Sequence, residues 1–272
     1  MNSVTKFAKT SEKNEGEGRN WLQLPRDVMF LIFTKLGAIG ILYSAQSVCS
    51  SWRNLSKESD LFQFIDFRNP WHFLDGNVID AKKLSKEAVD RSNGNLIEIS
   101  LEDIGTDELL DYIVDKSSNS IKCLRLLFCD QVSITGLIEF VRKVPLLEEL
   151  ELCHSPCSGE LIEELGRSCL QLKCFKLSCI AFRFMRVESD EEAFAIAEDM
   201  TQLRRLQLFG NKLTNNGLEA ILDECTHLEY LDLRRCFNID LRGDLEKKCV
   251  ERVKTVRFPN DLCDDFEYEF VE

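Results

Sequence analysis

Histidine and cysteine are among the side chains in this sequence that could carry out catalysis or bind a metal ion. The three histidines, His72, His154 and His227, lie far apart in the chain. Hydrolysis by a covalent mechanism needs a nucleophile, a base within hydrogen-bond reach and a group that orients the base. No segment of the sequence gathers such a set, so we expect a protein that is not an enzyme.

Twelve cysteines form the second chemical signal. The densest group runs from Cys153 to Cys157, with Cys174 and Cys179 downstream, and its spacing matches no usual zinc site. The sequence also lacks a P-loop and a dinucleotide-binding glycine motif, so we expect neither a metal nor another cofactor. The first 18 residues lack the apolar stretch of a signal peptide, which favours reduced thiols that pack as small apolar side chains. A thiol-based enzyme or sensor is the alternative, and it predicts loss of activity on alkylation.

The composition restricts the class of partner. The formal net charge is −13, so phosphate backbones are repelled over most of the surface and we expect no nucleic-acid partner. The longest apolar run has six residues, which is too short to span a membrane. Residues 1–19 are expected to be a disordered N-terminus and residues 260–272 an acidic tail. We expect the protein in the nucleus, the cytoplasm or both.

Residues Trp21 to Leu55 contain a helix start followed by an unusual apolar run. The pair Leu24-Pro25 predicts a helix with Pro25 at its first position, where a missing N–H costs nothing. At about 100° per residue, the six apolar residues from Val28 to Phe33 point all round the helix axis. A module of about 45 residues is too small to bury all of them by itself. The segment therefore predicts a docking module whose remaining apolar residues are covered by another protein.

This segment resembles the F-box. The resemblance rests on the opening Leu24-Pro25-Arg26-Asp27-Val28, on Ile32-Phe33 and Lys35-Leu36-Gly37, and on the pairs Val48-Cys49 and Trp52-Arg53. It implies a three-helix module over residues 20–65 that binds a Skp-type adaptor and, through the adaptor, a cullin. The residues that the resemblance implies at the adaptor are Leu24, Pro25, Val28, Ile32, Phe33, Leu36, Val48, Cys49, Trp52 and Leu55. The sequence leaves open which of them face the adaptor and which face the module's own core.

A repeated pattern fills the rest of the chain. The template L-x-x-L-x-L occurs in seven registers with spacings of 25, 26, 25, 31, 25 and 25 residues, which begin at Leu96, Ile121, Leu147, Leu172, Leu203, Leu228 and Val253. This period predicts a leucine-rich-repeat solenoid over residues 96–259, an α/β fold with a curved parallel sheet inside and helices outside. Residues 66–95 are predicted to be a linker or a degenerate capping repeat. In the longest repeat, Ser189 with Glu192 predicts a capping box for a short added helix.

The residue three positions after the template strengthens the resemblance. It is Cys129, Asn211 or Cys236 in three of the repeats, and such side chains can satisfy backbone groups inside a turn. The chain resembles plant Skp-interacting F-box proteins with cysteine-containing repeats. This resemblance implies the substrate-recognition subunit of a Skp-cullin-F-box ubiquitin ligase. The alternative is an adaptor-bound structural scaffold that delivers nothing to a cullin.

Alternation along each strand predicts that the third, fifth and seventh template positions lie on the concave face. Acidic residues dominate the first three rows of that face, and basic residues dominate the last four. The basic rows are predicted to bind an acidic or phosphorylated segment of an unknown target protein. The predicted contact residues are Lys176, Arg205, Phe209, Tyr230, Arg234 and Arg257. Two alternatives stay open: an ordinary solvated strand face, and a patch that the chain's own acidic tail covers.

Overall fold

The computed structural model describes residues 24–69, 81–179 and 187–264 of the chain. The helices are α1 (Arg26–Tyr43), α2 (Ser50–Leu55), α3 (Ala81–Ser92), α4 (Asp107–Ser117), α5 (Ile134–Lys143), α6 (Gly159–Ser168), α7 (Glu191–Asp199), α8 (Asn215–Glu224) and α9 (Asp244–Arg252), with short 3-10 helices at η2 (Ala45–Ser47) and η3 (Ser59–Phe62). The strands are β1 (Phe64–Phe67), β2 (Glu98–Glu102), β3 (Cys123–Leu127), β4 (Glu149–Cys153), β5 (Cys174–Ser178), β6 (Arg205–Phe209), β7 (Tyr230–Asp232) and β8 (Thr255–Arg257).

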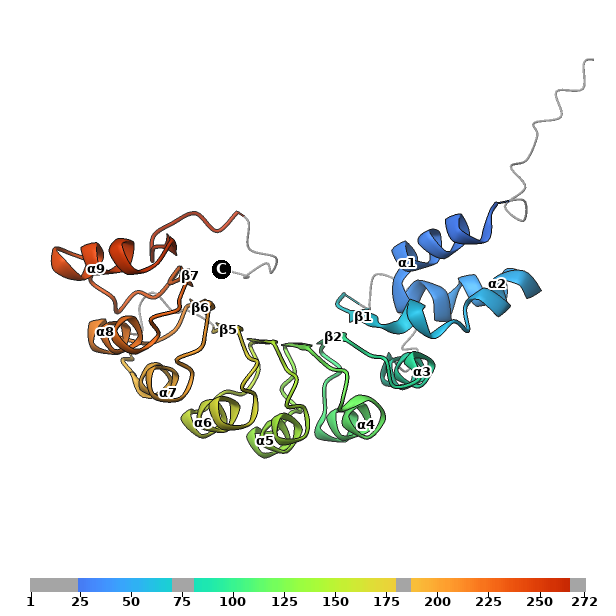
Figure 1. Cartoon of the computed structure of the whole chain (residues 1–272), viewed down its shortest axis with the longest axis horizontal. Helices are drawn as coiled ribbons and strands as arrows, with labels where there is room; N and C mark the ends of the chain where they lie inside the picture. Colours follow the sequence, from blue (N-terminus) through green and yellow to red (C-terminus); the bar gives the residue numbers. More distant parts are fainter. Residues whose placement is uncertain (1–23, 70–80, 180–186, 265–272) are drawn as a thin grey trace, which may run out of the picture.

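These elements form an arc with the strands on its inner side and helices α4 to α9 on its outer side (Figure 1). The strands described make one parallel sheet in sequence order, from β1 to β8. Third template positions pair across the whole sheet, for example Glu98 with Cys123 and Cys174 with Arg205. Strands β2 to β8 coincide with the seven predicted registers, so the prediction of an α/β leucine-rich-repeat solenoid is confirmed.

The template leucines form the core between the sheet and the outer helices. Leu150 and Leu152 of β4 are fully buried, and so are Leu137 and Val141 of α5. A single repeat consists of one strand and one helix, which are too few to cover its apolar side chains. Each repeat therefore buries its apolar face only when the neighbouring repeats are present.

Side chains in the turns after the strands join neighbouring repeats. The Cys129 thiol donates to the carbonyl of Leu101 in the preceding strand, with a sulfur–oxygen distance of 3.6 Å. The Ser155 hydroxyl donates in the same way to the carbonyl of Leu126, at 3.1 Å. Serine therefore makes the hydrogen bond that the sequence pattern predicted for cysteine and asparagine, because the turn requires only a short side chain that can hydrogen-bond.

The N-terminal module consists of helical segments that pack on the first strand. Pro25 is the N-cap of α1, with an extended backbone (φ −55°, ψ 148°), so the helix begins at Arg26, one residue later than predicted. Gly37 has a φ of 68° inside α1 and separates two helical segments, a conformation that glycine adopts at little cost. With α2 this gives the three helical segments that the F-box resemblance implies.

The region between the two modules contributes to the sheet. Strand β1 pairs in parallel with β2, with Phe64 opposite Glu98 and Phe67 opposite Leu101, and α3 follows it. Ile65 and Phe67 of β1 point into the core and are buried. The N-terminal module is therefore joined to the solenoid through a paired strand.

The predicted capping box in the longest repeat is wrong. Helix α7 begins at Glu191, its N-cap is Asp190, and no side chain caps its first turn. The Asp190 carboxylate instead accepts hydrogen bonds from the backbone N–H and the hydroxyl of Thr214 in the next repeat, at 2.6 and 2.7 Å. Helix α7 is the repeat's own outer helix rather than an addition, and residues 180–186 of the longer connection lie outside the described residues.

Candidate functional site

Helix α1 has one apolar face that its own module buries and another that stays exposed. Met29 and Phe33, four residues apart, are buried, whereas Val28 and Leu31, three residues apart, are exposed. Leu31 is the most exposed of them, at 63% of its full surface, and Leu36 is also exposed. The apolar run that pointed all round the axis is thus covered on one side only. The other side can bind a partner.

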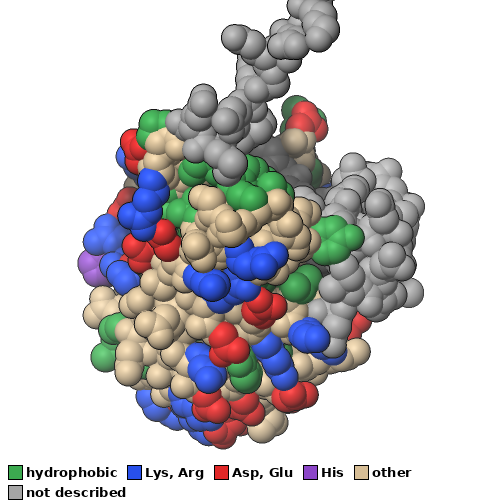
Figure 2. Space-filling view, turned by 90° about the vertical axis from the view of Figure 1, so that its right-hand side faces the viewer, with side chains coloured by type: hydrophobic (Ala, Val, Ile, Leu, Met, Phe, Trp, Pro, Cys, Tyr) green, Lys and Arg blue, Asp and Glu red, His purple; other side chains and the backbone are tan. Residues whose placement is uncertain are grey.

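The turn before α2 adds another exposed apolar side chain. Val48 is 60% exposed. Its neighbour Cys49 is the N-cap of α2, where its sulfur accepts a hydrogen bond from the backbone N–H of Trp52 at 3.5 Å. Figure 2 views the molecule from this end and shows hydrophobic side chains in the upper part of the face, above mixed acidic and basic ones.

Phe33 and Leu55, which the resemblance implied at the adaptor, belong to the module's own core. Phe33 is fully buried, and its ring meets that of Trp52 edge to face, with 5.4 Å between the centroids. Leu55 is buried at the end of α2. Trp52 and Ile32 are half-buried, so each divides its surface between the core and the outside. The structure thus removes Phe33 from the candidate contacts, whereas Leu55 also lines a cavity at the module's surface.

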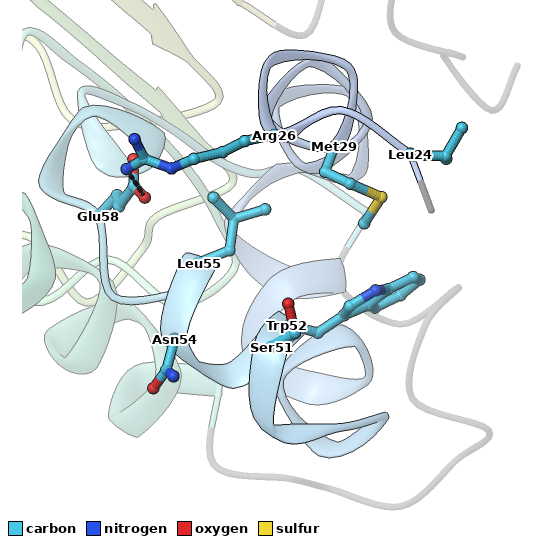
Figure 3. Close-up of a pocket in the computed structure, with 8 residues that line it drawn as sticks. All are labelled: Leu24, Arg26, Met29, Ser51, Trp52, Asn54, Leu55 and Glu58. Carbon is cyan, nitrogen blue, oxygen red and sulfur yellow. Dashed lines mark hydrogen bonds and ion pairs between the residues drawn. The ribbon is translucent and has the colours of Figure 1, made fainter. Parts of the chain in front are cut away.

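A cavity of about 400 Å³ opens between the start of α1 and helix α2 (Figure 3). Met29 points from α1 towards Trp52 of α2, and Leu24 stands at the edge beside the exposed Pro25. An ion pair between Arg26 and Glu58 crosses one end of the cavity. The full lining is Leu24, Arg26, Met29, Ser51, Trp52, Asn54, Leu55 and Glu58. Such a cavity suits an apolar side chain of a partner, while a polar group of that partner could bind the polar side chains at the cavity's rim.

The middle of the concave face contains an ion-pair network. Arg125 on β3 pairs with Glu98, with Glu149 at 3.1 Å and with Glu151 at 3.4 Å. Lys176 on β5 pairs with the same two β4 carboxylates, Glu149 at 2.9 Å and Glu151 at 3.1 Å. Two cations and three carboxylates thus neutralise most of one another's charge across four neighbouring strands.

Lys176 therefore does not act as part of a separate basic patch. Burial alone would lower the pKa of its ammonium group, but the carboxylates of Glu151 and Glu149 raise that pKa above its usual value. Burial likewise works to raise the pKa of Glu149, yet Lys176 and Arg125 hold it below its usual value. Both groups stay charged at neutral pH, and their charges are directed at each other.

Side chains at the seventh template position are not exposed on the concave face of β3 to β6. Leu127, Cys153, Ser178 and Phe209 are all buried. In three of the four strands the next residue has a positive φ, so the chain bends and the alternation of the strand ends there. Phe209 is fully buried, with the guanidinium group of Arg234 5.8 Å from its ring centroid, so it is not a surface anchor.

Arg234 forms a buried ion pair with Asp232. The Asp232 carboxylate accepts hydrogen bonds from Nε of Arg234 at 3.0 Å and from Nη2 at 2.7 Å. The side chain of Arg234 is 3% exposed and that of Asp232 is 0% exposed. Arg257 on β8 lies 3.7 Å from the carboxylate of Asp261. These two predicted contact residues therefore already interact with groups of this chain.

Arg205 on β6 is the predicted cation that remains exposed. Its guanidinium group lies over the ring of Tyr230 on β7, 5.0 Å from the centroid, and no carboxylate pairs with it within the described ranges. Tyr230 is half-buried. The pair presents a positive charge and an aromatic edge on a rigid strand surface, which suits a carboxylate or phosphate.

The comparisons with known proteins agree with this architecture. Residues 21–68 match the family model described as F-box-like, and residues 200–222 match the one described as Leucine Rich repeat. Over 252 residues the chain is 46% identical to the F-box protein SKIP19 of Arabidopsis thaliana, across 93% of this chain and 81% of that protein. It is 42% identical over 258 residues to the putative F-box/LRR-repeat protein 22 of the same plant, across 94% and 82%.

This chain belongs to the F-box/LRR-repeat family. The putative F-box/LRR-repeat protein 23 of Arabidopsis thaliana is 47% identical over 247 residues. That alignment covers 90% of this chain but only 55% of the relative. F-box proteins bind Skp-type adaptors, and members of the family are typically not catalytic. Within the described residues, no helix is long and apolar enough to cross a membrane.

Burial makes most thiols of this F-box/LRR-repeat protein poor nucleophiles. All twelve cysteines are free. Burial raises the pKa of Cys129, Cys174, Cys179, Cys225 and Cys249 to about 11. A reactive cysteine needs a lowered pKa, so these side chains do not support a thiol-based enzyme or sensor. Of the histidines, His154 stacks on Phe128, His227 is exposed, and His72 lies outside the described residues.

Folding stability is expected to fall as pH rises from about 9 to about 11. In the unfolded chain the thiols have a pKa of about 8.5. In the folded chain five buried thiols have a pKa of about 11. The stability that they contribute is therefore fully present below the unfolded pKa and is lost as pH rises through the folded one. Urea midpoints measured from pH 7 to pH 11 test this. A Cys225→Ala, Cys249→Ala variant serves as the control and is expected to lose less stability over the same range.

Two groups of functional interest were not predicted from the sequence. Leu31 lies within the predicted adaptor-facing range Val28 to Leu36 but was not named as a candidate contact, although its position three residues after Val28 on one helix face was a usable signal. The ion-pair network was also missed. Its signal was the alternation of charge across neighbouring fifth positions, from Arg125 to Glu151 to Lys176, which a comparison between repeats would have shown.

Proposed function

We propose that this F-box/LRR-repeat protein is the substrate-recognition subunit of a Skp-cullin-F-box ubiquitin ligase. Its main support is a folded F-box that leaves Leu31 and Val48 mostly exposed while it is joined through β1 to the solenoid. The exposed apolar side chains suit the adaptor, and the solenoid holds a second surface for a target. We propose the nucleus, the cytoplasm or both as its location.

In this proposal the chain itself catalyses nothing. It holds a target protein close to the conjugating machinery, so that a bimolecular encounter becomes a local one with a much higher effective concentration. The paired strand β1 makes the connection between the two modules stiffer than a free linker, which helps to fix the position of the target relative to the adaptor.

The target surface that we propose is centred on Arg205 and Tyr230, with Arg257 beside them on β8. These residues occupy neighbouring rows of one face, since Arg205 pairs with Tyr230 and Tyr230 with Thr255 in the sheet register. Arginine and tyrosine on a rigid strand surface favour an acidic or phosphorylated segment. Lys176, Phe209 and Arg234 are not included, because Lys176 is held in close ion pairs and the other two side chains are buried.

Co-purification tests the proposal. The tagged chain is expected to bring down a Skp-type adaptor together with a cullin, and proximity labelling is expected to find a protein that accumulates when the F-box is deleted. Recovery of the adaptor without any cullin, and without accumulation of a labelled protein, contradicts the proposal and favours an adaptor-bound scaffold.

An Arg205→Glu variant separates the two surfaces in the same experiment. It is expected to retain the adaptor and the cullin and to lose the labelled target, because only the concave face has changed. Arg167→Glu on the outer helix α6 is the matched control, since Arg167 is also an exposed arginine. Retention of the target by the Arg205 variant argues against this surface.

A further inference from the structure

The chain turns back towards the concave face after its last strand. The backbone carbonyl of Leu262 accepts a hydrogen bond from Nη1 of Arg234 at 3.1 Å and another from Nη2 of Arg257 at 2.9 Å. Both arginines therefore already bind a peptide carbonyl that arrives from beyond β8. We call Arg205, Tyr230 and Arg257, which are exposed or half-buried, the arginine surface. The buried Arg234 is not part of it.

A tight turn fixes the direction of this segment. The backbone N–H of Phe258 donates to the Asp261 carboxylate at 2.9 Å, and the N–H of Asp261 donates to the carbonyl of Phe258 at 3.0 Å. The same carboxylate lies 3.7 Å from Arg257. The described chain thus contacts Arg234 and Arg257 at Leu262, two residues before the described part ends at Asp264.

The sequence that follows has the chemistry that this surface selects. Residues 265–272 read DFEYEFVE, with four acidic residues and no basic one. Acidic residues alternate with Phe266, Tyr268 and Phe270, so an extended segment would present carboxylates on one side and rings on the other. Carboxylates pair with arginine guanidinium groups, and rings stack on them.

We propose that residues 265–272 are an intramolecular ligand of the arginine surface and compete there with the target. Eight extended residues can span about 26 Å, and neighbouring strands lie about 4.8 Å apart, so the segment can pass from β8 to Arg205 on β6. The binding of the segment does not depend on the proposed function. Only the competition with a target rests on it.

A peptide in trans tests this inference on the purified chain alone. The probe is a fluorescent synthetic peptide with the sequence of residues 265–272, and the two proteins are the full chain and a chain that ends at Asp264. A tethered segment has an effective concentration of about 1 mM, so for a peptide Kd of about 0.1 mM the full chain is expected to bind the probe about tenfold more weakly. Anisotropy titration measures both affinities.

The controls separate specific binding from general attraction. A probe with amides in place of its four side-chain carboxylates is expected not to bind, and Arg205→Glu in the shortened chain is expected to weaken binding, whereas Arg167→Glu is not. Equal affinity of both chains, no binding to the shortened chain, or equal binding of the amide probe overturns the inference. None of these results concerns the adaptor or the cullin, so the proposed function is tested separately.

Discussion

A variant with Leu31→Asp and Val48→Asp is expected to lose binding to a Skp-type adaptor and to keep its fold. Burial of one large aliphatic side chain contributes about 1.5–3 kcal/mol, and a carboxylate placed in an apolar interface adds a cost of desolvation. Two substitutions therefore remove at least about 4 kcal/mol of binding free energy, which is about a thousandfold in Kd. Both side chains are about 60% exposed in the free chain, so the free energy of unfolding should change little.

Calorimetric titration with a purified adaptor and a urea unfolding curve measure the two quantities. The matched control is Leu170→Asp with Val250→Asp, because these side chains are 72% and 57% exposed and lie in the solenoid, before β5 and on α9. The control is expected to bind the adaptor as the natural chain does. Unchanged affinity of the Leu31 and Val48 variant would show that the exposed face of α1 is not the docking surface.

Replacement of Asp232 by alanine is expected to destabilise the chain by about 3–5 kcal/mol. The substitution leaves the guanidinium group of Arg234, which is only 3% exposed, without the carboxylate that accepts two of its hydrogen bonds. It also removes the acceptor of the Arg234 backbone N–H, at 3.0 Å. The effect comes from leaving a buried charged group without its hydrogen-bond acceptors, and not from the net strength of the ion pair.

Urea unfolding with an unchanged m-value measures this loss. Glu229→Ala is the control in the same strand region, because it breaks the exposed pair with Arg204 and is expected to cost less than about 1 kcal/mol. A double variant, Asp232→Leu with Arg234→Leu, is expected to recover most of the stability, since both charges are removed. An Asp232→Ala effect no larger than that of Glu229→Ala contradicts the prediction.

Sequence patterns predicted the repeats better than the residues that face a partner. The period of about 25 residues placed β2 to β8 correctly because every repeat must bury the same leucine positions against its neighbours. The alternation rule failed at the ends of β3 to β6, and in three of these four strands Phe128, His154 or Gly210 turns the chain with positive φ. A local capping pattern at Ser189 failed because Asp190 bonds to the next repeat instead.

By itself, the sequence determined the α/β solenoid, the F-box resemblance and the acidic character of both the surface and the tail, because these depend on spacing and composition. Only the tertiary structure decided which charges remain available. Arg125 and Lys176 find their carboxylates in neighbouring repeats, more than twenty positions away, at distances that parallel stacking of the strands sets. The tertiary structure also decided which face of α1 is exposed, because Phe33 packs against Trp52 and leaves Leu31 on the outside. Contacts between residues distant in sequence select the functional surface, and the pattern within a single repeat does not show them.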